Sequence, residues 1–217
     1  MHGVLKTTVI SFLAVVALAV YDFVLPVFTE TLTANYTIIG LIFSLFAIAG
    51  IIAEIPIGLA VDKYGRIKIL VFSLFGIAGI GIIYFFTNNL LLLAVLSLVF
   101  GTIEGMFWIP SMVLIRDFSP HGMFCRAEGI YMTGTQFGWV IGPILAGIAI
   151  SMFSERHGFL LITLFMLLAG VISLILFRGK KFQKQNKGHG KEIKPGHVLS
   201  AMKEYFGINR MAGAAFF

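Results

Sequence analysis

Six apolar runs dominate the sequence, and each is close to the roughly 20 residues that a helix needs to cross a bilayer. The runs are continuous and not alternating, which favours helices over the strands of a membrane barrel. Charged residues make up 12% of the chain, about half the share that is typical of soluble domains. The sequence therefore predicts an all-α integral membrane protein with six transmembrane helices. The predicted spans cover residues 7–28, 37–61, 69–86, 90–115, 129–153 and 159–177.

The first apolar run could also imitate a secretory signal sequence. Ala17, Leu18 and Ala19 resemble a cleavage site. The run nevertheless continues to Phe28, which makes it long enough to cross the bilayer. We therefore expect an uncleaved first helix, because cleavage would leave five spans and break the charge pattern of the loops.

Positive charge is distributed unevenly between the two sides of the predicted membrane. The chain has 16 Lys and Arg residues, and the predicted topology places all of them except Arg156 on one side. Cytoplasmic loops of membrane proteins carry such an excess, so the net charge of +6 reflects orientation and not a nucleic-acid partner. We expect a multi-pass protein of the plasma (cytoplasmic) membrane with a cytoplasmic N-terminus.

The sequence becomes basic and polar after the sixth span. The sequence predicts a transmembrane bundle over residues 1–178 and a cytoplasmic basic linker with an amphipathic helix over 179–210. Such a helix is expected to lie at the lipid interface. Residues 211–217 turn apolar again but are too few to cross a bilayer, so they predict the start of an incomplete seventh span. We expect the sequence to be the first half of something longer.

The segment GLAVDKYGRIK (58–68) joins the second and third apolar runs and holds the first dense group of charges. We expect the second helix to end near Val61, with Asp62 directly after it. Gly65 has no Cβ and would let the backbone reverse tightly. The residues of interest in this segment are Gly58, Asp62, Lys63, Gly65, Arg66 and Lys68.

Glycines recur every four residues in the fifth apolar run. Gly134, Gly138 and Gly142 would stack on one helix face and let a neighbouring backbone approach closely. Pro143 follows and is expected to bend the helix, since it removes a backbone hydrogen bond. Gly147 completes the predicted packing motif.

These two segments resemble signatures of the major facilitator superfamily of transporters. Residues 58–68 resemble G-x-x-x-D-[RK]-x-G-R-x-[RK], which lies between the second and third helices of that family. The stretch GWVIGPILAG resembles its fifth-helix signature, G-x-x-x-G-P-x-x-G-G, with Ala146 in place of the first closing glycine. The resemblance implies the N-terminal six-helix half of such a transporter, with a three-plus-three internal repeat.

A looser likeness extends the resemblance to the predicted loop 116–128. Arg116, Asp117 and Arg126 resemble the acid and arginines of the family's loop between helices four and five. The resemblance implies that these residues and those of segment 58–68 act in gating. The family's fourth helix also often carries R-x-x-x-G, but Gly101 stands at the arginine position here, which puts proton coupling by the usual route in doubt.

Asp22, Glu54 and Glu104 lie inside predicted spans, where a charge is costly unless it is paired, hydrated or protonated. In the family, helices one and four line the central cavity, so Asp22 and Glu104 are the first candidates for binding protons or a cationic substrate. Each carboxyl group could instead be satisfied by a neighbouring hydroxyl or amide. Trp108 and Gln136 could line a cavity, although aromatic residues at helical spacing more often belong to the core.

The sequence favours a secondary active transporter that moves a small solute by alternating access. The fifth-helix signature favours proton-coupled efflux of a drug or metabolite, and the missing partner would be a C-terminal six-helix half. The alternative is a half-size, non-transporting scaffold or assembly partner in the membrane. An enzyme is disfavoured because all five His lie in tails or loops. We expect no cofactor or metal, and the single Cys125 excludes an intramolecular disulfide and a cysteine-based cluster.

Overall fold

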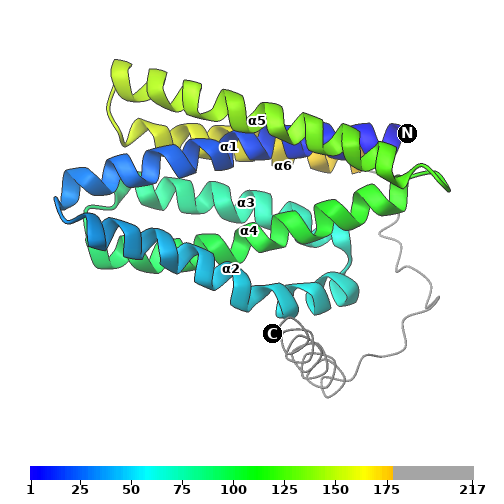
Figure 1. Cartoon of the computed structure of the whole chain (residues 1–217), viewed down its shortest axis with the longest axis horizontal. Coiled ribbons are helices and arrows are strands. Elements are labelled where there is room, and N and C mark those ends of the chain that lie inside the picture. Colours follow the sequence, from blue (N-terminus) through cyan, green and yellow to red (C-terminus); the bar gives the residue numbers. More distant parts are fainter. Residues whose placement is uncertain (178–217) are drawn as a thin grey trace, which may run out of the picture. The chain divides into compact units, whose positions relative to one another are not determined.

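The structure is a computed structural model that describes residues 1–177. The predicted linker, amphipathic helix and seventh span lie outside the described residues. The described part of the chain forms six long helices (Figure 1): α1 (His2–Leu32), α2 (Tyr36–Tyr64), α3 (Arg66–Phe86), α4 (Leu90–Phe118), α5 (Phe124–Met152) and α6 (His157–Phe177). Each is long and apolar enough to cross a membrane. The predicted fold class is therefore confirmed.

The helices extend beyond the predicted spans, and the predicted loop 116–128 is wrong in extent. Helix α4 continues to Phe118 and α5 begins at Phe124, so only residues 119–123 connect them. An apolar run marks the part of a helix that lies in hydrocarbon, whereas the backbone hydrogen bonds can continue into the polar headgroup region. Cys125 and Arg126 consequently lie in the first turn of α5 and not in a loop.

Asparagine side chains begin two of the helices at the same end of the bundle. Asn35 Oδ1 accepts a hydrogen bond from the Thr37 backbone N–H at 3.0 Å, and Asn89 Oδ1 accepts one from the Leu91 N–H at 2.8 Å. Such caps satisfy backbone donors that the first turn of a helix leaves free. The caps therefore stabilise the starts of α2 and α4.

The bundle is built from two three-helix units related by an internal repeat. Helix α1 packs most extensively on α5, as α4 packs on α2, and α1 contacts α6 as α4 contacts α3. Exchanging the first three helices for the last three therefore preserves the main contacts. Helix α4 also begins 88 residues after α1 (Leu90 against His2), and α5 begins 88 residues after α2 (Phe124 against Tyr36). The three-plus-three arrangement predicted from the sequence is present.

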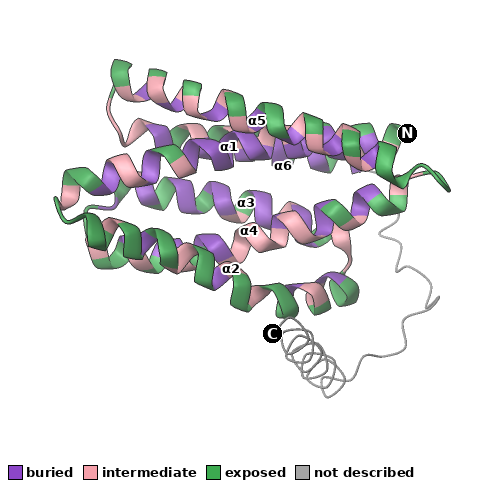
Figure 2. Cartoon of the chain, in the orientation of Figure 1, coloured by how far each residue is buried: buried purple, intermediate pink, exposed green. Residues whose placement is uncertain are grey.

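Burial differs strongly among the helices. Helix α1 lies inside the bundle, whereas α2 is mostly exposed (Figure 2). The centre of the core is a stack of Tyr21 on Phe100, with ring centroids 3.7 Å apart. The Tyr84 hydroxyl bonds to the Tyr21 hydroxyl at 3.2 Å and to Ser97 Oγ at 3.0 Å, which satisfies these buried polar groups. This network fixes α1, α3 and α4 together.

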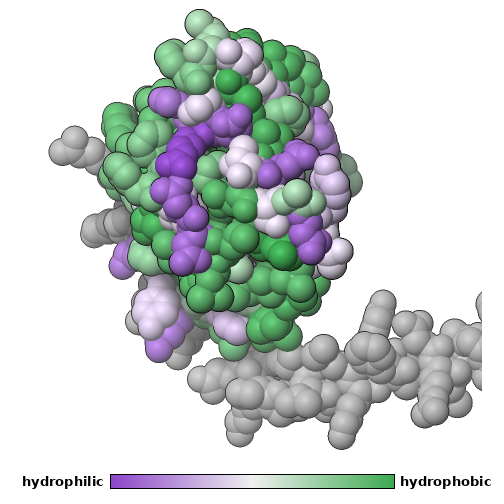
Figure 3. Space-filling view, turned by 90° about the vertical axis from the view of Figure 1, so that its left-hand side faces the viewer, coloured by the Kyte–Doolittle hydropathy of each residue, from purple (hydrophilic) through white to green (hydrophobic). Residues whose placement is uncertain are grey.

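Basic side chains gather at one end of the bundle. The N-terminus, the α2–α3 turn and the α4–α5 loop lie at this end, and the other three connections lie at the opposite end (Figure 1). At the opposite end, seen face-on in Figure 3, hydrophilic groups lie among larger apolar areas. Of the seven Lys and Arg residues described, only Arg156 belongs to that opposite end.

Candidate functional site

The turn between α2 and α3 brings the charges of segment 58–68 to the basic end of the bundle. Helix α2 continues to Tyr64, so the prediction that it ends near Val61 is wrong, and Asp62 lies in its last turn. The helix stops where Gly65 adopts a φ of 94°, a backbone conformation that favours glycine. Its N–H donates to the Val61 carbonyl at 3.0 Å, which completes the last turn.

Arg66 connects this turn to the end of α4. Its guanidinium forms an ion pair with the Asp117 carboxylate, and each side chain is about one quarter exposed. Asp62 and Arg116 also interact electrostatically with Arg66. The structure thus brings together the two charged segments, 58–68 and 116–126, that the sequence singled out separately.

The remaining residues of these segments lie on α2, α3 and α5. The Lys63 ammonium lies 5.2 Å from the centroid of the Tyr64 ring. Lys68 lies in the first turn of α3, and Arg126 is exposed in the first turn of α5. A Cβ at Gly58 would meet nothing within 4 Å, so this glycine lies on an open face of α2.

The glycine face of α5 packs against α1. A Cβ at Gly134 would lie 2.4 Å from Thr8 Cγ2, and one at Gly138 would lie 3.1 Å from the Phe12 carbonyl oxygen. A Cβ at Gly142 would lie 2.4 Å from the Cβ of Ala19. A larger residue at any of the three positions would require the neighbouring atoms of α1 to shift, so the three glycines allow the close approach of the two helices.

Gly147 differs from the other glycines of α5. A Cβ there would meet nothing within 4 Å, so it takes no part in this contact. At 3.6 residues per turn, Gly147 points about 140° away from Gly142. Ala146, which is fully buried, holds the next position on the packed face. Pro143 lies within α5, and the helix continues through it to Met152.

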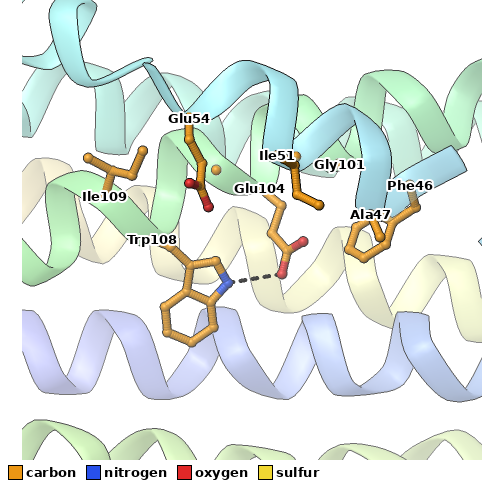
Figure 4. A pocket seen from close by; sticks show the side chains of 10 residues that line it. Phe46, Ala47, Ile51, Glu54, Gly101, Glu104, Trp108 and Ile109 are labelled. Atoms are coloured by element: carbon orange, nitrogen blue, oxygen red, sulfur yellow. Dashed lines mark hydrogen bonds between the residues drawn. The ribbon is translucent and has the colours of Figure 1, made fainter. Parts of the chain in front are cut away.

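A pocket of about 350 Å³ lies between α2 and α4 (Figure 4). Helix α2 contributes one acid, Glu54, and α4 contributes another, Glu104. The other residues that line it are Phe46, Ala47, Gly50, Ile51, Gly101, Gly105, Trp108 and Ile109.

Trp108 holds the carboxyl group of Glu104. Its indole N–H donates to Glu104 Oε1 at 2.9 Å, across one helical turn of α4. Glu54 is exposed and makes no hydrogen bond or ion pair within the part of the chain described. Figure 4 shows its carboxyl group and that of Glu104 pointing into the same space. The pocket therefore has two carboxyl groups, of which one is held and one is free.

The sequence grouped Glu104 with Asp22, whereas the structure places it in a pocket with Glu54. Asp22 is half-buried in α1, and its charge interacts with that of Glu104, but it does not line the pocket. Gln136 is exposed on α5 and does not line the pocket either. The glycines of α2 and α4 could have revealed the pocket, since they mark where these helices approach one another.

Gly101 lies directly against the backbone of α2. A Cβ there would lie 2.1 Å from the Phe46 carbonyl oxygen, which belongs to the rigid backbone of α2. Gly50 faces the Gly101 carbonyl from the other helix, at 3.7 Å from its own ideal Cβ position. Gly101 occupies the position at which the resembled family often carries an arginine. In this chain the small residue there lets α2 pack against α4.

Comparison with known proteins identifies relatives among membrane transporters. Residues 7–217 match the family described as Major Facilitator Superfamily. An uncharacterized MFS-type transporter of Methanocaldococcus jannaschii is 26% identical over 164 residues, which cover 76% of this chain and 42% of that protein. A hexuronate transporter of Bacillus subtilis is 30% identical over 153 residues, covering 68% and 35%. An efflux pump of Aspergillus niger is 30% identical over 108 residues, covering 50% and 23%. The chain thus spans less than half the length of these relatives.

Proposed function

This chain belongs to the Major Facilitator Superfamily, and from that premise we propose that it is the N-terminal six-helix part of a secondary transporter that moves a small solute by alternating access. The observation that carries the proposal is the pair of carboxyl groups, Glu54 and Glu104, in a pocket within the membrane-spanning bundle. Ionisable groups in such positions are costly and usually belong to a substrate or ion pathway.

We propose that a second six-helix unit covers the exposed sides of α2 and α5. Helix α2 is the least buried of the six, although it is among the more apolar. In a complete transporter the solute would lie between the two units, and the pocket would open to the two sides of the membrane in turn.

The charged end of the bundle supports a gating role for the Arg66–Asp117 ion pair. The pair joins the start of α3 to the end of α4 at the side where six of the seven described basic residues lie. We propose that this side faces the cytoplasm, following the positive-inside rule, and that the ion pair stabilises one of the two access states.

The orientation can be tested with Cys125, which is the only cysteine of the chain and is exposed. A membrane-impermeant maleimide should label it in inside-out vesicles and leave it unlabelled in sealed right-side-out vesicles. Labelling in right-side-out vesicles would reverse the proposed orientation.

The proton-coupling part of the proposal assigns Glu104 as the group that takes up and releases a proton. Trp108 holds this carboxyl group in the pocket, where a change of its charge alters what the pocket can bind. Efflux in exchange for protons would follow from a solute and a proton competing for the same pocket.

The decisive experiment reconstitutes the complete natural protein in proteoliposomes and measures solute counterflow with and without a proton gradient. The wild type should transport in both conditions and accumulate solute only with the gradient. Glu104→Gln should retain counterflow and lose the response to the gradient, whereas Glu30→Gln, a control at an exposed acid, should behave as wild type. A protein that moves no solute in either condition would favour the non-transporting scaffold.

A further inference from the structure

The pocket between α2 and α4 has the chemistry of a site for an organic cation. Its ten lining residues include two acids and no Lys, Arg or His. The nearby charge of Asp22 is also negative and interacts with that of Glu104. A pocket of this composition attracts a cationic solute and repels an anion, and the attraction is strengthened by the low dielectric around it.

The apolar part of the pocket favours an organic cation over a metal ion. Phe46 and Trp108 supply aromatic surface, and Ala47, Ile51 and Ile109 supply aliphatic surface. The residues described include no group of three or more His, Cys, Asp or Glu that could hold a metal. Aromatic faces attract quaternary and protonated amines, so the same walls that suit an amine offer a hard cation too few oxygen ligands.

The two carboxyl groups are not equivalent. Glu104 already accepts a hydrogen bond from Trp108, whereas the Glu54 carboxylate has no described partner. Glu54 also lies beside the rim of the pocket, where Ile51 is 70% exposed. A ligand that enters from the surface of α2 and α4 would therefore meet the free carboxylate of Glu54.

We propose that this pocket binds a small organic monocation, with Glu54 as the partner of its positive charge and Trp108 against its apolar part. The inference rests on the proposed transport function and names its substrate class. A volume of about 350 Å³ is at the small end of ligand pockets, which limits the solute to about the size of a single-ring amine. The two acids of the pocket also argue against an acidic sugar as the substrate, although one relative of this chain is a hexuronate transporter.

The test uses the complete natural protein in nanodiscs and measures equilibrium binding by calorimetry. The probe is benzyltrimethylammonium, and its matched neutral control is neopentylbenzene, which has the same shape without the charge. Wild type should bind the cation and show no comparable affinity for the neutral isostere or for glucuronate. Glu54→Gln should raise the Kd for the cation by about ten- to hundredfold, within the range for the loss of one opposite charge at contact distance near a protein surface.

Further variants separate the charge of Glu54 from the stability of the fold. Glu54→Asp should bind the cation more tightly than Glu54→Gln, and the exposed control Glu30→Gln should bind as wild type. Equal Kd values for wild type and Glu54→Gln, or equal affinity for the neutral isostere, would overturn the inference. Binding is measured in nanodiscs of phosphatidylcholine, whose headgroup carries a quaternary ammonium, and of phosphatidylglycerol, whose headgroup carries none. Weaker binding of the probe in phosphatidylcholine alone would show that the lipid headgroup competes for the pocket and would assign the site to a lipid.

The outcome for the substrate class is distinct from that for transport. A protein that transports another solute but fails to bind the cation would refute this inference and keep the transport function. A protein that binds the cation through Glu54 but moves no solute in proteoliposomes would keep this inference and refute the transport function.

Discussion

The contacts α1–α5 and α2–α4 are equivalent in the internal repeat, yet one is closed and the other holds a pocket. Along α1–α5, Gly134, Gly138 and Gly142 keep the two helices close over several turns. Along α2–α4, Gly101 lies against the Phe46 carbonyl, and the pocket beside it is lined by two acids and Trp108.

The difference shows that the repeat determines the arrangement of the helices, while side chains decide what each contact does. A ladder of glycines on one face permits dry packing and leaves no room for a ligand. Helices α2 and α4 also meet through glycines, at Gly101 and at Gly105, where a Cβ would lie 2.9 Å from Ile57 Cδ1, but the pocket beside these glycines is lined by Glu54, Glu104 and Trp108. The candidate site is therefore on the side of the repeat where acids and an aromatic residue lie beside the glycine contacts.

The largest expected effect comes from placing a bulky side chain at the glycine contact between α2 and α4. Gly101→Val places its side chain against the Phe46 carbonyl, which is backbone and cannot rotate away. We expect a loss of about 3 kcal/mol or more in folding stability, at the upper end of overpacking effects. The measurement is the yield of monodisperse protein and its melting temperature in detergent. Gly79→Val is the control, because a Cβ there meets nothing within 4 Å.

A smaller loss of stability is expected from the glycine ladder of α1–α5. Gly142→Ala adds one methyl group 2.4 Å from the Cβ of Ala19 and 2.8 Å from the Val16 carbonyl. We expect a loss of about 1–2 kcal/mol, seen as a lower melting temperature. Gly147→Ala should leave stability unchanged or raise it slightly, since alanine favours helices. Equal melting temperatures for the two variants would contradict the assignment of the packed face.

The six helices could be predicted from the sequence because the length of an apolar run can be compared directly with the thickness of the bilayer. The ends at Phe86, Leu90 and Phe177 agree with the predicted spans. The ends near Asp62, Phe118 and Phe124 do not, because the helices continue into charged segments where hydropathy no longer gives a signal. The resemblance to the fifth-helix signature places Gly147 in the packing motif, but a residue five positions after Gly142 does not return to the same face of the helix.

The candidate site was predicted only in part. Glu104 and Trp108 could be singled out, because an acid in an apolar span is conspicuous and the two residues are one turn apart. The partnership of Glu104 with Glu54 could not be predicted, because it depends on the rotation of α2 against α4 that the Gly101 contact imposes. The ion pair of Arg66 with Asp117 similarly depends on how the bundle brings distant segments together.

The ion pair offers a test of how the start of α3 is held against the end of α4 at the basic end of the bundle. Arg66→Ala removes a pair that is partly exposed, so the loss of stability should be at most about 1 kcal/mol. If the pair stabilises one access state, counterflow should nevertheless change clearly. The double variant Arg66→Ala/Asp117→Ala should be no worse than either single variant. Arg126→Ala is the control, and an equal change in counterflow there would argue against a specific role for the pair.

The smallest expected effect on stability comes from adding a methyl group inside the pocket. Gly50 lines the pocket, and its ideal Cβ position lies 3.7 Å from the Gly101 carbonyl, an ordinary contact distance. Gly50→Ala should therefore change stability by no more than about 0.5 kcal/mol, in contrast to Gly142→Ala on the equivalent side. Because the methyl group takes up pocket volume, it should still weaken binding of benzyltrimethylammonium. Unchanged binding would show that the space beside Gly50 takes no part in binding the cation. A melting temperature lowered as far as that of Gly142→Ala would show that the α2–α4 side is packed as tightly as the α1–α5 side.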